Sequence, residues 1–147
     1  MVVCVPARLK YFTPEFMEQF NEEHKQHFPE SGASRGGWPD SGDGRYSKKL
    51  DYKDWVDFNN KMRVHQNFVE ALPLIITTLL LASLAFPLVT CVIDYINMVA
   101  RLVFTVMYVK FGANSRIIGA VAGGLPIYLL SLATLVTFCI RAGQAAI

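Results

Sequence analysis

Hydrophobic and polar positions divide this chain of 147 residues into two parts. A membrane-spanning helix needs about 20 largely apolar residues. The second part contains apolar stretches that predict three transmembrane helices, over residues 63–89, 90–110 and 116–141. Most charged residues lie before Ala71, and those beyond it are Asp94, Arg101, Lys110, Arg116 and Arg141.

The segment before the first span predicts a short amphipathic helix. Residues 13–15 (Thr-Pro-Glu) combine a hydroxyl cap, a proline at the first helical position and an acid in the first turn. Phe16, Phe20 and His24 then recur at a spacing that places them on one helix face. The pattern predicts a helix from about residue 14 to 27, on the surface of the membrane or of a bundle.

A loop and a further helix follow. Residues 31–45 are rich in Gly and Ser without periodicity, which is typical of a loop. A helix predicted to begin near Asp51 runs without a break into the first span. We expect residues 11–62 on the cytoplasmic side, because Lys and Arg are concentrated there and in the loop 110–116, whereas the turn at Pro87 has neither.

Composition argues against two other classes of protein. The net charge of +2 is small, and no basic stripe with interleaved aromatic residues indicates nucleic-acid binding. Cys4, Cys91 and Cys139 are far apart, and their spacing predicts neither a metal site nor a disulfide framework. We expect reduced thiols and no metal cofactor.

Polar residues recur at helical spacing in two of the predicted spans. A charge near the centre of a span costs about 2.5–3.5 kcal/mol even on the lenient scale, so Arg101 needs a partner, water or an anionic ligand. Antiparallel neighbours would bring Glu70 and Arg101 to similar depths in one polar pocket near the cytoplasmic ends of two helices. The two stripes are Arg63, Asn67 and Glu70 on the first helix, and Arg101, Phe104 and Tyr108 on the next.

These patterns leave structural alternatives open. A Glu70–Arg101 ion pair that only fixes helix packing explains the same spacing. Asp94 is expected near the opposite side of the membrane, where a structural role is the better interpretation. The small residues of the last span allow close approach of a neighbouring helix, including one from another subunit. They are Gly119, Gly123 and Gly124.

Residues 63–73 read R-x-H-x-N-x-x-E-x-x-P, which resembles the signature of the MAPEG family, the membrane-associated proteins in eicosanoid and glutathione metabolism. Residues 100–108 are similar to the third-helix motif of that family. Arg116 and Gly119 stand where the family places a basic residue and a glycine, and residues 7–11 resemble the segment after its first helix. Within the family the chain is most similar to the microsomal glutathione S-transferases.

The resemblance implies an all-α integral membrane bundle of the four-helix type, assembled as a homotrimer in the endoplasmic reticulum or a mitochondrial membrane. It implies that glutathione, a co-substrate, binds between neighbouring subunits at a site that faces the cytoplasm. The first family helix is mostly missing, with residues 1–10 as its remnant. The expected result is a single membrane domain over residues 1–147 with three clear transmembrane helices.

The same resemblance assigns the site. Arg116 would lie near the sulfur of glutathione and, with Tyr108, would be catalytic. Phe104 departs from the family pattern, because many active members have a tyrosine there. The residues that would bind glutathione are Arg8, Arg63, Asn67, Glu70, Arg101 and Tyr108.

The expected function is a glutathione-dependent transferase or peroxidase that acts on hydrophobic, lipid-derived or xenobiotic electrophiles. Arginines bind carboxylates through charge-assisted hydrogen bonds, and a nearby arginine favours the reactive thiolate. One alternative is a non-catalytic member of the family, which binds lipid or serves as an accessory subunit of a larger membrane complex. An isomerase of oxidised lipids would use the same residues.

Overall fold

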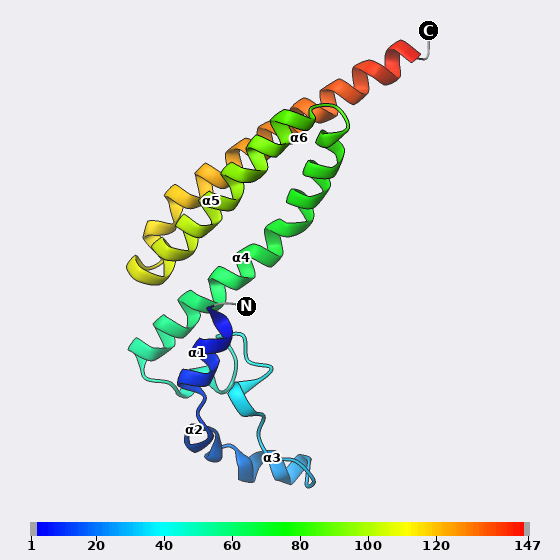
Figure 1. The fold of residues 1–147 in the computed structure, drawn as a ribbon. Coiled ribbons are helices and arrows are strands. Elements are labelled where there is room, and N and C mark those ends of the chain that lie inside the picture. Colours follow the sequence, from blue (N-terminus) through cyan, green and yellow to red (C-terminus); the bar gives the residue numbers. More distant parts are fainter. Residues whose placement is uncertain (1–2, 146–147) are drawn as a thin grey trace. The chain divides into compact units, whose positions relative to one another are not determined.

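The computed structural model describes residues 3–145, and every regular element within them is helical (Figure 1). This confirms the predicted all-α class. The α-helices are α1 (Cys4–Tyr11), α2 (Pro14–Glu18), α3 (Asn21–His27), α4 (Tyr52–Ser83), α5 (Pro87–Phe111) and α6 (Ile117–Ala145). Short 3-10 turns occur at η1 (Arg35–Gly37), η2 (Ser47–Lys49) and η3 (Ala113–Arg116).

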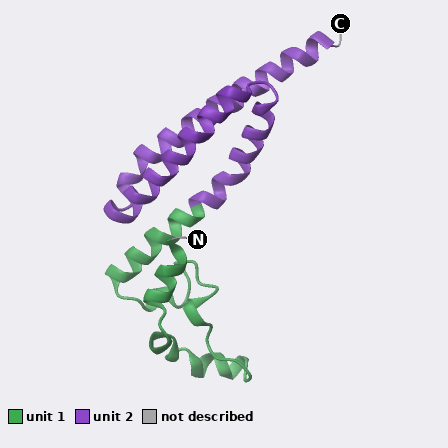
Figure 2. Ribbon diagram, viewed as in Figure 1, with its two compact units in different colours: residues 1–66 green, residues 67–147 purple. Residues whose placement is uncertain are grey.

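The chain forms two compact units, Met1–Gln66 and Asn67–Ile147 (Figure 2). The first unit contains α1, α2, α3 and the glycine-rich loop. The second contains α5 and α6, and α4 begins in the first unit and ends in the second. The first unit is mainly polar in sequence, and the second is largely apolar.

Three helices of the described residues, α4, α5 and α6, are long and apolar enough to cross a membrane, which confirms the predicted number of spans. α4 is one helix of 32 residues, as the sequence predicted. The predicted boundary of the first span needs correction, because α4 ends at Ser83 and α5 begins at Pro87 rather than at residue 90. Proline is favourable in the first turn of a helix, because the backbone N–H that it lacks would have no partner within the helix there.

The amphipathic helix expected over residues 14–27 is divided in two. Thr13 caps α2 as predicted, since its Oγ1 accepts from the Phe16 amide at 3.3 Å. The chain then turns, with the Phe20 amide donating to the Met17 carbonyl at 3.0 Å, and α3 begins at Asn21. This turn allows the Phe20 ring to pack against Tyr46, at a centroid distance of 4.8 Å, so tertiary packing overrides the helical periodicity.

α5 and α6 form an antiparallel hairpin whose close packing depends on glycine (Figure 1). A Cβ added to Gly119 would lie 2.5 Å from the backbone nitrogen of Phe104, and one added to Gly123 would lie 3.2 Å from the Ala100 Cβ. Both glycines are buried within one chain. They therefore serve the contact between α5 and α6 of one chain, whereas the sequence analysis allowed a neighbouring helix from the same or from another subunit.

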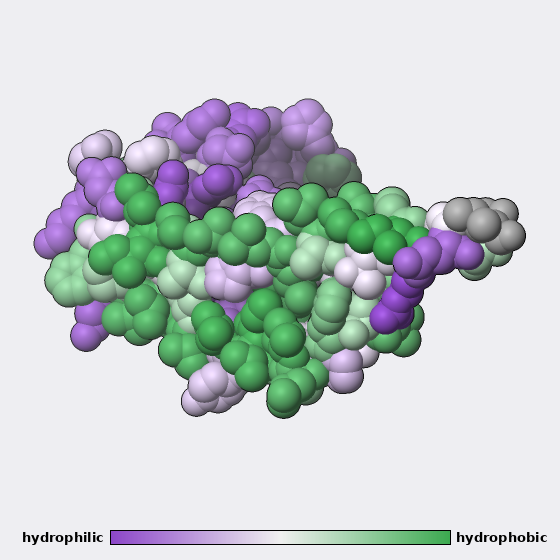
Figure 3. Space-filling view, turned by 90° about the horizontal axis from the view of Figure 1, so that it is seen from above, coloured by the Kyte–Doolittle hydropathy of each residue, from purple (hydrophilic) through white to green (hydrophobic). Residues whose placement is uncertain are grey.

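The outer surface of the hairpin is apolar, as a membrane-embedded surface requires. Hydrophobic side chains dominate the face drawn in Figure 3. Large exposed apolar residues occur on both helices, including Leu88, Leu102, Leu125, Leu129 and Leu132.

The first unit has an aromatic core. Phe58 of α4 is fully buried, and its ring lies 4.9 Å from that of Phe12 in an edge-to-face arrangement that suits aromatic quadrupoles. The buried members of this core are Cys4, Ala7, Tyr11, Phe12, Met17, Phe20, Phe58 and Met62.

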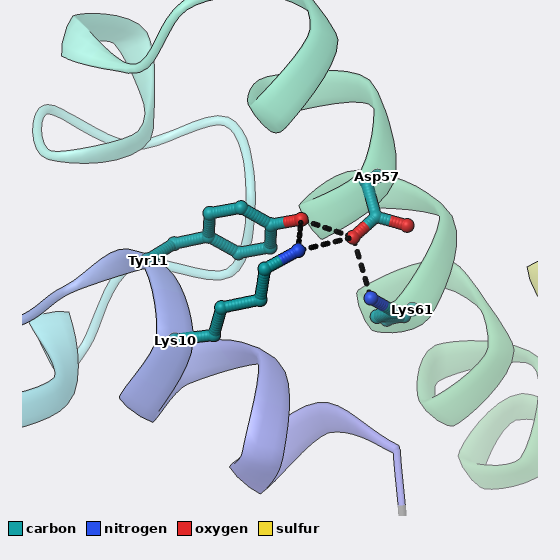
Figure 4. A network of polar contacts seen from close by, with 4 residues as sticks. All are labelled: Lys10, Tyr11, Asp57 and Lys61. Atoms are coloured by element: carbon teal, nitrogen blue, oxygen red, sulfur yellow. Dashed lines mark hydrogen bonds and ion pairs between the residues drawn. The ribbon is translucent and has the colours of Figure 1, made fainter.

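A polar network joins α1 to α4 at the edge of this core (Figure 4). The Tyr11 hydroxyl donates to the Asp57 carboxylate, and the Lys10 ammonium donates to the Tyr11 hydroxyl at 2.7 Å. Lys61, one turn beyond Asp57, donates to the same carboxylate oxygen. The Asp57 carboxylate thus anchors α1 through the buried Tyr11 and Lys10, and Lys61 of α4 adds a second cation to it.

The glycine-rich loop is organised around Asp40, whose side chain is buried. Its Oδ1 accepts from the amides of Gly42 (2.8 Å) and Gly44 (3.0 Å), and its Oδ2 accepts from the Ser47 amide at 2.7 Å. Gly42 adopts φ +116°, which favours glycine, and its carbonyl accepts from the Asn59 amide nitrogen at 2.8 Å. The loop is therefore an ordered part of the first unit.

The topology can be tested by cysteine labelling. In a variant with Cys91 and Cys139 replaced by Ala, Ser41→Cys and Ser115→Cys should react with a membrane-impermeant maleimide from the cytoplasmic side of sealed vesicles. Leu84→Cys should react from the other side, because the Pro87 turn and the η3 turn lie at opposite ends of α5. Equal access to all three positions from one side would contradict this topology.

Acid should open the loop of the first unit. Burial acts to raise the pKa of the Asp40 carboxyl, but the bonds from the Ser47, Gly42 and Gly44 amides and the Ser47 hydroxyl outweigh it and lower the pKa below its ordinary 3.8. The Asp40 carboxylate therefore stabilises the first unit above about pH 4, and this stabilisation is lost as the pH falls through the pKa that Asp40 has in the folded protein. Both tryptophans of the chain, Trp38 and Trp55, belong to this unit, so tryptophan fluorescence against pH reports the change.

Asp40→Ala is the matching variant. It should destabilise the first unit at neutral pH by about 2–3 kcal/mol, since amide donors lose a charged acceptor, and it should remove the acid transition. Asp43→Asn is the control, because Asp43 is an exposed carboxylate of the same loop. If the acid transition persists in Asp40→Ala, a group other than Asp40 causes it.

Candidate functional site

Arg101 and Asn67 meet inside the second unit. Arg101 lies on α5, and its Nη1 donates to the side-chain oxygen of Asn67 at 3.1 Å and more weakly to the Asn67 carbonyl at 3.5 Å. The guanidinium carbon also lies 5.0 Å from the centroid of the Phe68 ring. The structure therefore brings together two of the polar residues that spacing alone had placed on facing helices.

An open cavity of about 260 Å³ adjoins this pair. Glu70 lines the cavity on α4, one turn from Asn67, so carboxylate and guanidinium groups border the same space. A second cavity of about 180 Å³ lies against Phe104 and Gly119 and shares Asn67 and Arg101 with the first. The arrangement suits a ligand with both an anionic and a cationic group.

Arg116 contacts Tyr108 at the end of the hairpin. Its Nη1 donates to the Tyr108 hydroxyl at 3.2 Å, and its guanidinium carbon lies 5.6 Å from the ring centroid. The chain reverses at Gly112, which has φ +81° and whose amide donates to the Tyr108 carbonyl at 3.0 Å. The η3 turn then carries the exposed Arg116 back over the buried Tyr108.

Phe104 lies between these two groups on α5. It is buried, and its ring meets that of Tyr108 edge to face at 5.5 Å. It supplies no hydroxyl, so the polar contacts next to it on this face of α5 come from its neighbours Arg101 and Tyr108.

Arg8 and Arg63 belong to the first unit, where they border a separate cavity of about 520 Å³. Arg8 is buried, and its Nη1 donates to the carbonyls of Gly36 (3.1 Å) and Gly37 (3.2 Å). Its Nη2 donates to the Asp40 carbonyl, and its guanidinium stacks 3.7 Å above Trp38. Arg8 thus holds the glycine-rich loop, a contribution that the sequence did not suggest.

The pKa of Arg8 reflects this position. Burial lowers it below its ordinary value, and Asp40 and Cys4 act in the opposite direction. An arginine remains charged in such a setting. The loop carbonyls therefore face a permanent cation.

Two residues border the Arg101 cavity that sequence reasoning missed, Asn97 and Tyr128. Asn97 continues the stripe of Arg101, Phe104 and Tyr108 by one further turn, so the helical spacing could have revealed it. Tyr128 carries no such signal, because its approach to Arg101 depends on how α6 packs against α5.

The sequence model of the MAPEG family matches residues 17–136, well over half of the chain. This chain belongs to the MAPEG family. The family includes transferases and related enzymes of glutathione and eicosanoid metabolism, and membership agrees with three membrane-spanning helices in an integral membrane protein. Comparison with curated proteins and with solved structures gives no significant match.

The packing of the MAPEG hairpin can be tested at Gly119. Gly119→Ala forces a Cβ to within 2.5 Å of the Phe104 backbone, and overpacking of this kind costs about 1–3 kcal/mol. We expect a lower midpoint of thermal unfolding in detergent, followed by circular dichroism. Gly143→Ala on the same helix is the control, because nothing lies within 4 Å of its added Cβ; equal midpoints for the two variants would contradict the close approach.

Proposed function

We propose that this MAPEG protein is a glutathione-dependent transferase or peroxidase that acts on hydrophobic electrophiles. The observation that carries the proposal is Arg101, a cation within a membrane span that contacts Asn67 and borders an open cavity with Glu70. Intramembrane ionisable groups are costly and mark functional sites by default.

The chemistry of glutathione suits these groups. The tripeptide has two carboxylates and one ammonium, so it offers partners for arginine and for glutamate. Arginine binds carboxylates by charge-assisted hydrogen bonds. Arg101 would bind a carboxylate, Glu70 the ammonium and Asn67 the backbone of the peptide.

Arg116 would act on the sulfur. A free thiol has a pKa of about 8.5, and the thiolate is the nucleophile. Lowering that pKa by about 2 requires about 2.7 kcal/mol of differential interaction, which a nearby guanidinium can supply in a partly dry site. The contact between Arg116 and Tyr108 keeps the cation close to the polar face of α5.

The proposal includes an assembly and a location. A homotrimer in the endoplasmic reticulum or a mitochondrial membrane would place the site toward the cytoplasm, where glutathione is available. Hydrophobic electrophiles would approach from the bilayer, across the apolar surface of the hairpin.

A second candidate is a non-catalytic MAPEG protein that binds lipid or serves as an accessory subunit. Burial of Phe104 favours it, because the position beside Tyr108 provides no hydroxyl.

The decisive experiment compares two arginines. Arg116→Ala should reduce turnover of a model electrophile by about 10²-fold, the scale of losing one electrostatic stabiliser, while the Kd for glutathione measured by calorimetry changes little. Arg101→Ala should first weaken binding, by about tenfold or more. Ultraviolet detection of thiolate formation separates the two roles, and Lys110→Ala supplies an exposed-cation control from the end of α5.

Two results would count against the proposal. Thiolate formation and turnover that persist in Arg116→Ala would remove the catalytic role of Arg116. A purified protein that binds no glutathione would favour the accessory-subunit candidate.

A further inference from the structure

Asn97 is a buried amide in the middle of an apolar helix. Its side chain is 5 % exposed, although it lies in a span that otherwise carries mostly apolar residues. It is located one turn before Arg101 on the same face of α5. The four-residue step between these positions corresponds to about 6 Å along the helix axis.

One hydrogen bond fixes the orientation of this amide. Asn97 Nδ2 donates to the Gly123 carbonyl of α6 at 2.9 Å. Only the amino end of an amide can donate to a carbonyl, so the bond also determines which end faces α6. Gly123 permits the approach, because an added Cβ would lie 3.3 Å from Asn97 Nδ2.

The same side chain lines the cavity that contains Arg101 and Glu70. Within residues 3–145, the bond to Gly123 is the hydrogen bond that the amide makes, and its oxygen is left as an acceptor. The Asn97 amide oxygen thus lies at the same cavity as the Arg101 guanidinium and the Glu70 carboxylate. An α-amino acid group suits this combination, because it has an ammonium donor and a carboxylate acceptor on one carbon. The spacing of Asn97 and Arg101 allows one such group to contact both.

We propose that Asn97 is a ligand-binding residue whose amide oxygen accepts a hydrogen bond from the ammonium of an α-amino acid group, while Arg101 binds the neighbouring carboxylate. Under the proposed function, on which this inference rests, that group is the γ-glutamyl end of glutathione. Asn97 then determines specificity for a free ammonium. An interhelical bond that only fixes packing is the competing explanation, since buried amides also join membrane helices.

The test compares two peptides on one set of variants. Calorimetry gives the affinity for glutathione and for N-acetylglutathione, which lacks the ammonium, and their ratio measures the preference for a free ammonium. Asn97→Ala should lower this ratio about tenfold. Asn97→Asp keeps an oxygen of similar position and adds negative charge, so it should raise the ratio and remains informative if Asn97→Ala does not fold.

Thr134→Val is the matched control, because Thr134 is a buried polar residue of α6 whose hydroxyl donates within its own helix to Leu130. It should leave the ratio unchanged even if it lowers thermal stability. A ratio that stays at the unsubstituted value in both Asn97 variants overturns the inference and leaves the proposed function intact. Failure of the unsubstituted protein to bind either peptide overturns the proposed function and the inference with it.

Discussion

A guanidinium held inside an apolar span is the constraint on which the second unit depends. The charge of Arg101 costs about 2.5–3.5 kcal/mol at the centre of a membrane helix even on the lenient scale, unless polar groups or water compensate. α4 supplies the compensation through Asn67, at 3.1 Å. This contact determines which face of α4 turns toward the hairpin, and Glu70, one turn further along that face, borders the same cavity as a consequence.

The hairpin adds a steric constraint to this electrostatic one. Because Gly119 has no side chain, α6 approaches the Phe104 backbone to a distance that any Cβ would prevent. The short interhelical distance then allows a loop arginine, Arg116, to reach Tyr108 from beyond the end of α5. The geometry at the end of the site therefore depends on a residue that has no side chain.

Local rules predicted the features that depend on local physics. Apolar length predicted the number of spans, and the continuity of α4 followed from an uninterrupted helical pattern across residues 52–83. The sequence analysis placed Pro87 near the end of the first span, but proline is also favourable at the start of a helix, and the structure has it as the first residue of α5. They also missed the break at Phe20, whose position depends on a contact with Tyr46 that lies far away in the sequence.

In the candidate site, too, some residues were predictable from the sequence and others were not. Helical spacing predicted that Asn67 and Arg101 lie on facing helices, and extending the same stripe by one turn would have added Asn97. The glycine-rich loop had no periodicity to interpret, since its order comes from amides that converge on Asp40 and from carbonyls that converge on Arg8. These hydrogen bonds connect residues that are far apart in the sequence, so they produce no periodic pattern along the chain.

Arg8 and Arg101 show why residue type alone does not assign a site. Arg8 donates to three loop carbonyls and stacks on Trp38, and its buried Nε lacks a partner within residues 3–145. The hydrogen bonds of Arg101 in the described residues all come from Nη1 and all reach Asn67, which leaves the other face of its five-donor fork for the cavity. In the cavity that Arg8 borders, loop carbonyls already engage its guanidinium, whereas Arg101 can donate to a carboxylate without losing Asn67. Arg101 therefore has more of its N–H donors available to a ligand than Arg8 has.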